Sequence, residues 1–150
     1  MTESKSKIEI FDDYLEEKDH KLIYDYFMGN MDKGDIQNSM CWTWLDGISQ
    51  KGDGHFQLVH QVFFNNQPIS PAWELMKPIL DKEEVIGLAR IKSNCLIKTE
   101  KEIIFDWAFH TDFHDLGDEA ITAIYYVNSN NGKTVFEDGK YVESKANRFV

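Results

Sequence analysis

The chain has 150 residues, of which 42% are hydrophobic, and its formal net charge is -10 at pH 7. This length and composition fit one folded domain with a buried core better than a disordered chain. The acidic balance repels phosphate backbones and anionic lipids, which argues against nucleic acid and membranes as partners.

Cysteine spacing and hydropathy favour a reducing, intracellular setting. Cys41 and Cys95 make no disulfide framework and no zinc-binding pattern. No apolar run approaches the roughly 20 residues that a membrane-spanning helix needs, and the first residues lack the apolar segment of a signal peptide. We therefore expect a cytoplasmic protein.

The N-terminal part has the pattern of a short strand followed by a helix. Asp12 and Asp13 can cap a helix, and Asp13 with Glu16 resembles a capping box. Apolar residues then fall on one helical face, and Gly29 supplies a C-terminal stop. We predict a helix over residues 13–28.

Two strands are predicted next, at residues 40–45 and 56–64, with a turn at 51–54 between them. In the second strand, alternation puts four side chains on one side: Phe56, Leu58, His60 and Val62. We interpret His55 and His60 as structural residues, although either could bind a metal in principle.

Ser70-Pro71 begins a second predicted helix, with serine as N-cap and proline at the first helical position. Pro78 should kink or shorten this helix because it lacks an N–H and clashes with the preceding turn. The charged residues 81–84 should end it.

From residue 85 onward the pattern becomes extended. Residues 86–97 predict one long strand, on which Arg90, Lys92 and Asn94 share a face that either lines a polar cavity or is solvated. Shorter strand-like segments follow at 107–112, 119–128, 134–137, 140–144 and 147–150. Helices followed by many short strands predict an α+β fold, with helices packed on an antiparallel β-sandwich or jelly roll.

The triplet His110-Thr111-Asp112 carries the clearest chemistry. Residues two apart on a strand point to the same face, so His110 and Asp112 can offer two ligands of a 2-His-1-carboxylate iron site. His114 is a rival ligand. The acidic, glycine-containing sequence after it indicates that the strand ends first, so we expect His114 to lie behind the ligands or to face solvent.

Residues 109–150, from FHTDFHDLGD to ESKANRFV, resemble the core of the 2-oxoglutarate/Fe(II)-dependent dioxygenases. The resemblance is closest to the prolyl 4-hydroxylase-like branch, including its small viral and bacterial members, and covers about residues 86–150. It implies a double-stranded β-helix, or jelly roll, with N-terminal support helices. The implied single domain, 1–150, has a support region at 1–85 and an incomplete jelly-roll core at 86–150, with its last strands missing.

The resemblance also implies roles for individual residues. His110 and Asp112 match the first two iron ligands of the family. Tyr126 matches the position that hydrogen-bonds the far carboxylate of 2-oxoglutarate. Thr134 matches a position in the pocket wall, and Asn94 would face the cavity.

The chain departs from the family pattern in two places. Leu96 occupies a position where a tyrosine often contacts the co-substrate. The family's second histidine, and the arginine or lysine that follows it and pairs with 2-oxoglutarate, are not matched, because the sequence stops at Val150 just before that histidine is due. Arg148 comes too early to be the pairing residue. The resemblance thus implies a truncated form of a longer enzyme, or a site that a partner chain completes.

We therefore expect an Fe(II)- and 2-oxoglutarate-dependent dioxygenase that uses O2 to hydroxylate an unactivated C–H bond. Its substrate would be a prolyl or other side chain of a peptide, or a small metabolite. The alternative is a catalytically incomplete fragment or a non-enzymatic jelly-roll binding module, since a fold does not dictate its function. A cupin-like metalloprotein would need further histidines near the triplet.

Overall fold

The computed structural model describes residues 7–29, 40–48, 50–101, 103, 109–110 and 120–150. These residues form helices and antiparallel strands, which confirms the α+β class. The chain divides into two compact units. The first unit combines Met1–His20 with Thr111–Val150, and the second is Lys21–His110. The predicted organisation as one domain, divided near residue 85, stays a prediction.

Helix α1 spans Glu17–Met28 and begins later than predicted. Asp12 lies too far before this start to cap the helix, and its carboxylate binds Arg148. The Glu16 carbonyl accepts the first hydrogen bond of the helix, so Glu16 occupies the capping position. Gly29 has a φ of 71°, a left-handed conformation that ends helices readily and confirms the predicted stop.

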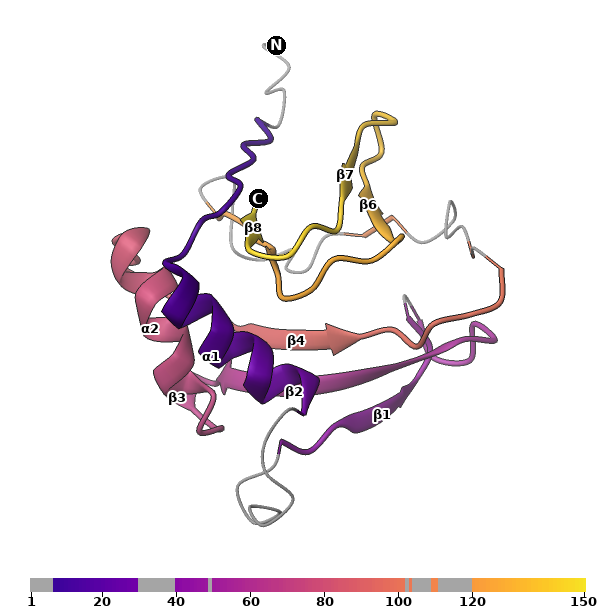
Figure 1. Cartoon of the computed structure of the whole chain (residues 1–150). Helices are drawn as coiled ribbons and strands as arrows, with labels where there is room; N and C mark the ends of the chain where they lie inside the picture. The colour runs from indigo at the N-terminus through magenta and orange to yellow at the C-terminus, as the bar shows by residue number, and fades with distance from the viewer. Residues whose placement is uncertain (1–6, 30–39, 49, 102, 104–108, 111–119) are drawn as a thin grey trace, which may run out of the picture. The chain divides into compact units, whose positions relative to one another are not determined.

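The sheet of the second unit is built around β2, which spans Phe56–Phe64 as predicted (Figure 1). Its partners are β1 (Thr43–Asp46), β3 (Gln67–Pro68) and β4 (Ile91–Cys95), all antiparallel to it. Because Leu58 pairs with both β1 and β4, these two strands flank β2 on opposite edges. β2 is therefore the central strand.

A shift in the pairing of β2 with β4 changes which side chains share a face. Gln61 pairs with Lys92, whereas Phe63 pairs with the next residue, Ile91, so β2 contains one extra residue. Paired residues lie on the same face, and Phe63 therefore joins the face of His60. The strict alternation predicted up to Val62 does not continue past Gln61.

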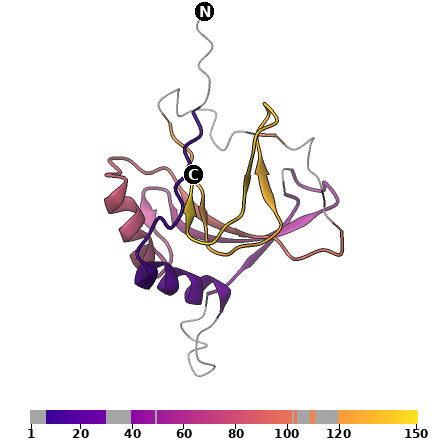
Figure 2. The ribbon, with the colours of Figure 1, turned by 45° about the horizontal axis from the view of Figure 1, so that its top comes forward.

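Both helices contact this face of the sheet (Figures 1 and 2). Phe27 of α1 meets the His60 ring edge-on, with centroids 6.2 Å apart. Trp73 stacks on Phe63 at 5.2 Å. The buried apolar side chains of this unit are Ile23, Phe27, Val59, Val62, Phe63, Ala72 and Met76.

Helix α2 spans Trp73–Lys82, which confirms that a helix follows Ser70-Pro71. The predicted start is wrong in detail, because Ala72 is the N-cap and both Ser70 and Pro71 precede the helix. The Ser70 hydroxyl accepts a hydrogen bond from the Ala72 N–H at 3.1 Å and fixes the turn that leads into α2. Pro78 lies inside the helix without ending it.

The long strand predicted over residues 86–97 is wrong in length. Only Ile91–Cys95 form β4, and residues 85–90 lie outside any strand. Strand β4 begins at Ile91, where its pairing with Phe63 starts. An extended sequence pattern becomes a strand only where a partner supplies the hydrogen bonds.

The first unit contains two strand pairs: β5 (Tyr125–Tyr126) with β8 (Arg148–Phe149), and β6 (Lys133–Val135) with β7 (Tyr141–Glu143). They correspond to the last four predicted strands but are shorter than predicted. The strand predicted at 107–112 lies mostly outside the described residues. Phe11 bridges Phe149 by two backbone hydrogen bonds, and the Tyr14 ring stacks on Phe149 at 4.4 Å.

Candidate functional site

Two of the residues assigned to the co-substrate pocket are in direct contact. The Tyr126 hydroxyl on β5 lies 2.6 Å from the Thr134 hydroxyl on β6, and both residues are half-buried. Burial raises the pKa of Tyr126, although the bond to Thr134 and the Arg148 charge act in the opposite direction. The phenol therefore stays protonated at neutral pH and can donate a hydrogen bond.

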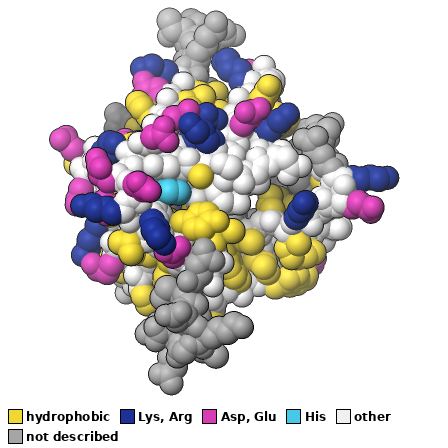
Figure 3. Space-filling view, in the orientation of Figure 1, with side chains coloured by type: hydrophobic (Ala, Val, Ile, Leu, Met, Phe, Trp, Pro, Cys, Tyr) yellow, Lys and Arg dark blue, Asp and Glu magenta, His cyan; other side chains and the backbone are white. Residues whose placement is uncertain are grey.

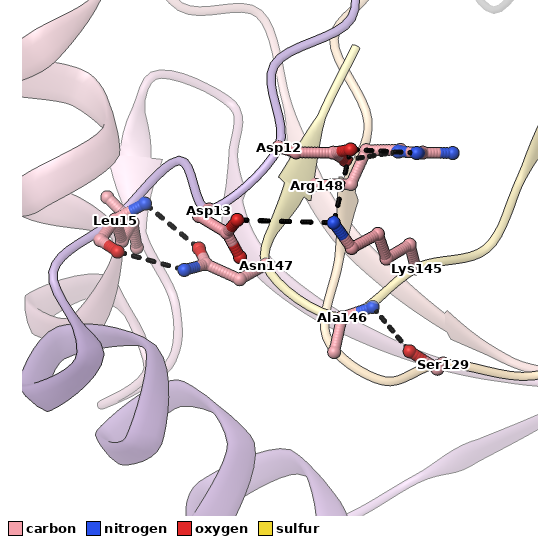
Figure 4. Close-up of polar contacts among 8 residues, drawn as sticks. All are labelled: Asp12, Asp13, Leu15, Ser129, Lys145, Ala146, Asn147 and Arg148. Atoms are coloured by element: carbon pink, nitrogen blue, oxygen red, sulfur yellow. Dashed lines mark hydrogen bonds and ion pairs between the residues drawn. The ribbon is translucent and has the colours of Figure 1, made fainter.

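Arg148 lies opposite Tyr126 in the β5–β8 pair, but an acidic partner holds its guanidinium. Nε and Nη2 donate to the two carboxylate oxygens of Asp12, at 2.7 and 3.1 Å (Figure 4). Lys145 also reaches Asp12, at 3.1 Å. The hydrogen bond from Arg148, followed by that from Lys145, lowers the pKa of Asp12 to about 2. Arg148 thus serves to join the N-terminal segment to β8.

Asn94 and His110 belong to the second unit and are both exposed. Asn94 lies on β4, where it pairs with Val59. Asp112 and the rival ligand His114 lie outside the described residues. The structure thus brings Tyr126 and Thr134 together in the first unit. Asn94 and His110 are described only within the second unit.

The donor chemistry of the predicted iron ligands suits Fe(II), which binds imidazole nitrogen and carboxylate oxygen. His110 supplies the first kind of donor, and Asp112 supplies the second by sequence. Within the residues that the structure describes, there is no cluster of three or more His, Cys, Asp or Glu side chains able to hold a metal. The match to an iron site therefore rests on the types of donor in the triplet.

A half-buried polar network in the first unit has no signature in the sequence. His20 Nδ1 lies 2.7 Å from the Tyr125 hydroxyl, which donates to Asn147 Oδ1 at 3.0 Å. Burial lowers the pKa of His20 and raises that of Tyr125, so both groups favour their neutral forms. These residues are far apart in the sequence and form no motif that could have indicated the network.

A second missed contact lies in the second unit. His60 on β2 places Nε2 2.6 Å from the Ser70 hydroxyl and Nδ1 2.8 Å from the Cys41 carbonyl oxygen. The helix-start pattern predicted a capping role for Ser70 and could not show that a strand histidine would reach its hydroxyl.

Exposed apolar side chains gather over β1 and the start of β2, where Figure 3 shows a hydrophobic area on the surface. Trp44 is 57% exposed, and its ring stacks on Phe56 with centroids 6.4 Å apart. Trp44 and Leu45 also line a shallow hollow with the polar side chains of Gln50 and Gln57. Such a surface is typical of sites that bind another molecule.

Comparison of the chain with protein-family models, with curated proteins and with solved structures finds no match. In the part of the chain that the structure describes, neither α1 nor α2 is long and apolar enough to cross a membrane.

Proposed function

We propose that this chain is a 2-oxoglutarate- and Fe(II)-dependent dioxygenase of the prolyl 4-hydroxylase-like type, built on a jelly roll. It hydroxylates an unactivated C–H bond, with a prolyl or other peptide side chain as the substrate class and a small metabolite as the other option. The hydrogen bond between Tyr126 and Thr134 carries the proposal. The resemblance assigns both residues to one co-substrate pocket, and their hydroxyls lie 2.6 Å apart.

In this proposal His110 and Asp112 hold the metal. The chemistry that Fe(II) supplies when bound with 2-oxoglutarate and O2 is an oxidation that yields succinate, CO2 and a hydroxylated product. The protein contributes binding, orientation and exclusion of water. The family's third ligand and its carboxylate-pairing cation are not assigned to residues of this chain.

Tyr126 binds the far carboxylate of 2-oxoglutarate. Either hydroxyl of the Tyr126–Thr134 pair can donate to the other. When Thr134 donates, the phenol proton is left for the co-substrate, and the raised pKa keeps that proton in place at neutral pH. Hydrogen bonds to a charged acceptor are stronger than those between neutral groups, which favours this arrangement once the carboxylate is bound.

Conversion of 2-oxoglutarate to succinate by the full-length protein, with Fe(II) and O2, tests this function. A His110→Ala variant should lose the activity, because it removes one of the two assigned ligands. A His114→Ala variant should keep most of it. If His114→Ala loses turnover and His110→Ala retains it, the ligand assignment is wrong.

A non-enzymatic binding module is the second candidate, supported by the exposed aromatic surface formed by Trp44 and Phe56. Large exposed apolar side chains cost solubility unless a partner uses them. Such a module would bind neither Fe(II) nor 2-oxoglutarate, so the same assays separate the two candidates.

A further inference from the structure

The His60–Ser70 contact has a defined direction of hydrogen bonding. The Cys41 carbonyl oxygen can only accept, so Nδ1 of His60 carries the proton that forms the 2.8 Å bond. In the neutral imidazole, Nε2 is then the acceptor, and the Ser70 hydroxyl donates to it at 2.6 Å. The serine proton therefore points at Nε2 of His60. The hydrogen bond at Nδ1 fixes the tautomer in which Nε2 is the acceptor.

We propose that Ser70 and His60 form a nucleophile–base pair that accepts an acyl or phosphonyl group from a reactive ester or fluoride. A serine hydroxyl, an acceptor nitrogen and a group that orients the imidazole are the three parts that activate a serine nucleophile. Here a backbone carbonyl takes the orienting position. The inference stands on residues of the second unit and is independent of the proposed dioxygenase function.

The reaction balances with an ester and water as reactants. The Ser70 oxygen bonds to the carbonyl carbon while its proton moves to His60 Nε2, and the bond from carbon to the leaving oxygen breaks as that oxygen takes the proton. Water then attacks the acyl carbon, its proton passes through Nε2 to the Ser70 oxygen, and the acid is released.

The side chains packed around His60 are aromatic, which suits a probe that carries an aryl group. Three aromatic rings meet the imidazole at steep angles, with centroid distances between 6.2 and 6.4 Å: Tyr26, Phe27 and Trp42. Pro71, the residue after the nucleophile, has no N–H to stabilise the oxyanion that develops on the carbonyl. We therefore expect covalent modification by reactive esters and fluorides rather than fast turnover.

An aryl fluorophosphonate probe tests the proposal on the full chain. The Ser70 oxygen should bond to phosphorus and release fluoride, adding one label that peptide mapping places on Ser70. His60→Gln should slow labelling about a hundredfold, since it removes the general base but leaves the serine that caps the turn before α2. Ser70→Ala should abolish the label.

Ser129→Ala is the matched control. Its hydroxyl also accepts a backbone N–H bond, from Ala146 at 2.9 Å, but pairs with no histidine among the described residues (Figure 4). Labelling should be unchanged in this variant and should disappear from the parent chain in urea. Absence of the label from Ser70 in the folded parent chain would overturn the proposal. Equal labelling rates in His60→Gln and the parent would overturn the role of His60.

Discussion

The Asn147 side chain binds both backbone polar groups of Leu15, a residue far away in the sequence. Its Oδ1 accepts from the Leu15 N–H at 2.9 Å, and its Nδ2 donates to the Leu15 carbonyl at 2.8 Å (Figure 4). Both residues are buried, and Asn147 has a φ of 60°. One side chain thus fastens the segment before α1 to the turn before β8.

Replacing Asn147 should destabilise the chain strongly. Asn147→Ala leaves the N–H and carbonyl of Leu15 without these partners and should cost about 2–4 kcal/mol in the free energy of unfolding. Asn147→Gly should cost less, because glycine tolerates the left-handed backbone. Urea denaturation measures both, and an equal loss in the two variants would show that backbone conformation does not contribute.

This contact also shows what the sequence could not reveal. Residues 56–64 were predicted with their observed bounds, because a continuous β-forming run lies between turn residues. The start of α1 was misplaced because the segment before it is held by residues far away in the sequence, Arg148 at Asp12 and Asn147 at Leu15, which no local pattern shows. The shift within β2 likewise depends on its pairing with β4.

The contacts at the candidate sites also include some between residues that the sequence had grouped and some that it had not. The resemblance assigned Tyr126 and Thr134 to one pocket; their hydroxyls are in contact, and the pocket itself stays a prediction. The His60–Ser70 and His20–Tyr125 contacts were missed, because each joins residues from separate elements with no spacing rule between them.

Helix α1 offers a test of the core with a neighbouring control. Ile23 is 1% exposed, whereas Leu22 is 57% exposed. Ile23→Ala should lower the free energy of unfolding by about 2–5 kcal/mol, through lost burial and the cavity that remains. Leu22→Ala should change it by no more than about 0.5 kcal/mol. Similar losses in the two variants would contradict the orientation of α1.

The Asp12–Arg148 pair should make stability depend on pH in the acid range. The pKa of Asp12 is about 2 in the folded chain, below its ordinary 3.8, so the pair stabilises the fold above pH 3.8. This contribution should disappear as the pH falls toward 2. NMR titration of the Asp12 carboxyl measures the pKa directly.

Asp12→Asn gives the matching stability test. Its denaturation midpoint should lie below that of the parent at neutral pH, and the difference should shrink on acidification and in high salt, which screens exposed charges. A difference that persists unchanged at pH 2 would show that hydrogen bonding rather than charge holds Arg148.

Tyr126 should contribute to co-substrate binding through its hydroxyl alone. Tyr126→Phe keeps the ring and should weaken 2-oxoglutarate binding about tenfold, as expected for loss of one hydrogen bond to a charged group. Tyr141→Phe, at a residue 56% exposed on β7, is the control and should bind normally. Isothermal titration calorimetry with Fe(II) under nitrogen compares the two. Equal affinities of the Tyr126→Phe variant and the parent for 2-oxoglutarate would show that the Tyr126 hydroxyl does not bind the co-substrate.

The most direct test of the proposed function is an anaerobic titration of the protein with Fe(II) and 2-oxoglutarate, followed by visible absorption. We predict a saturable metal-to-ligand charge-transfer band that requires both additions. It should be lost in His110→Ala and in Asp112→Ala, and retained in His55→Ala. Absence of the band from the full-length parent protein would contradict the dioxygenase assignment.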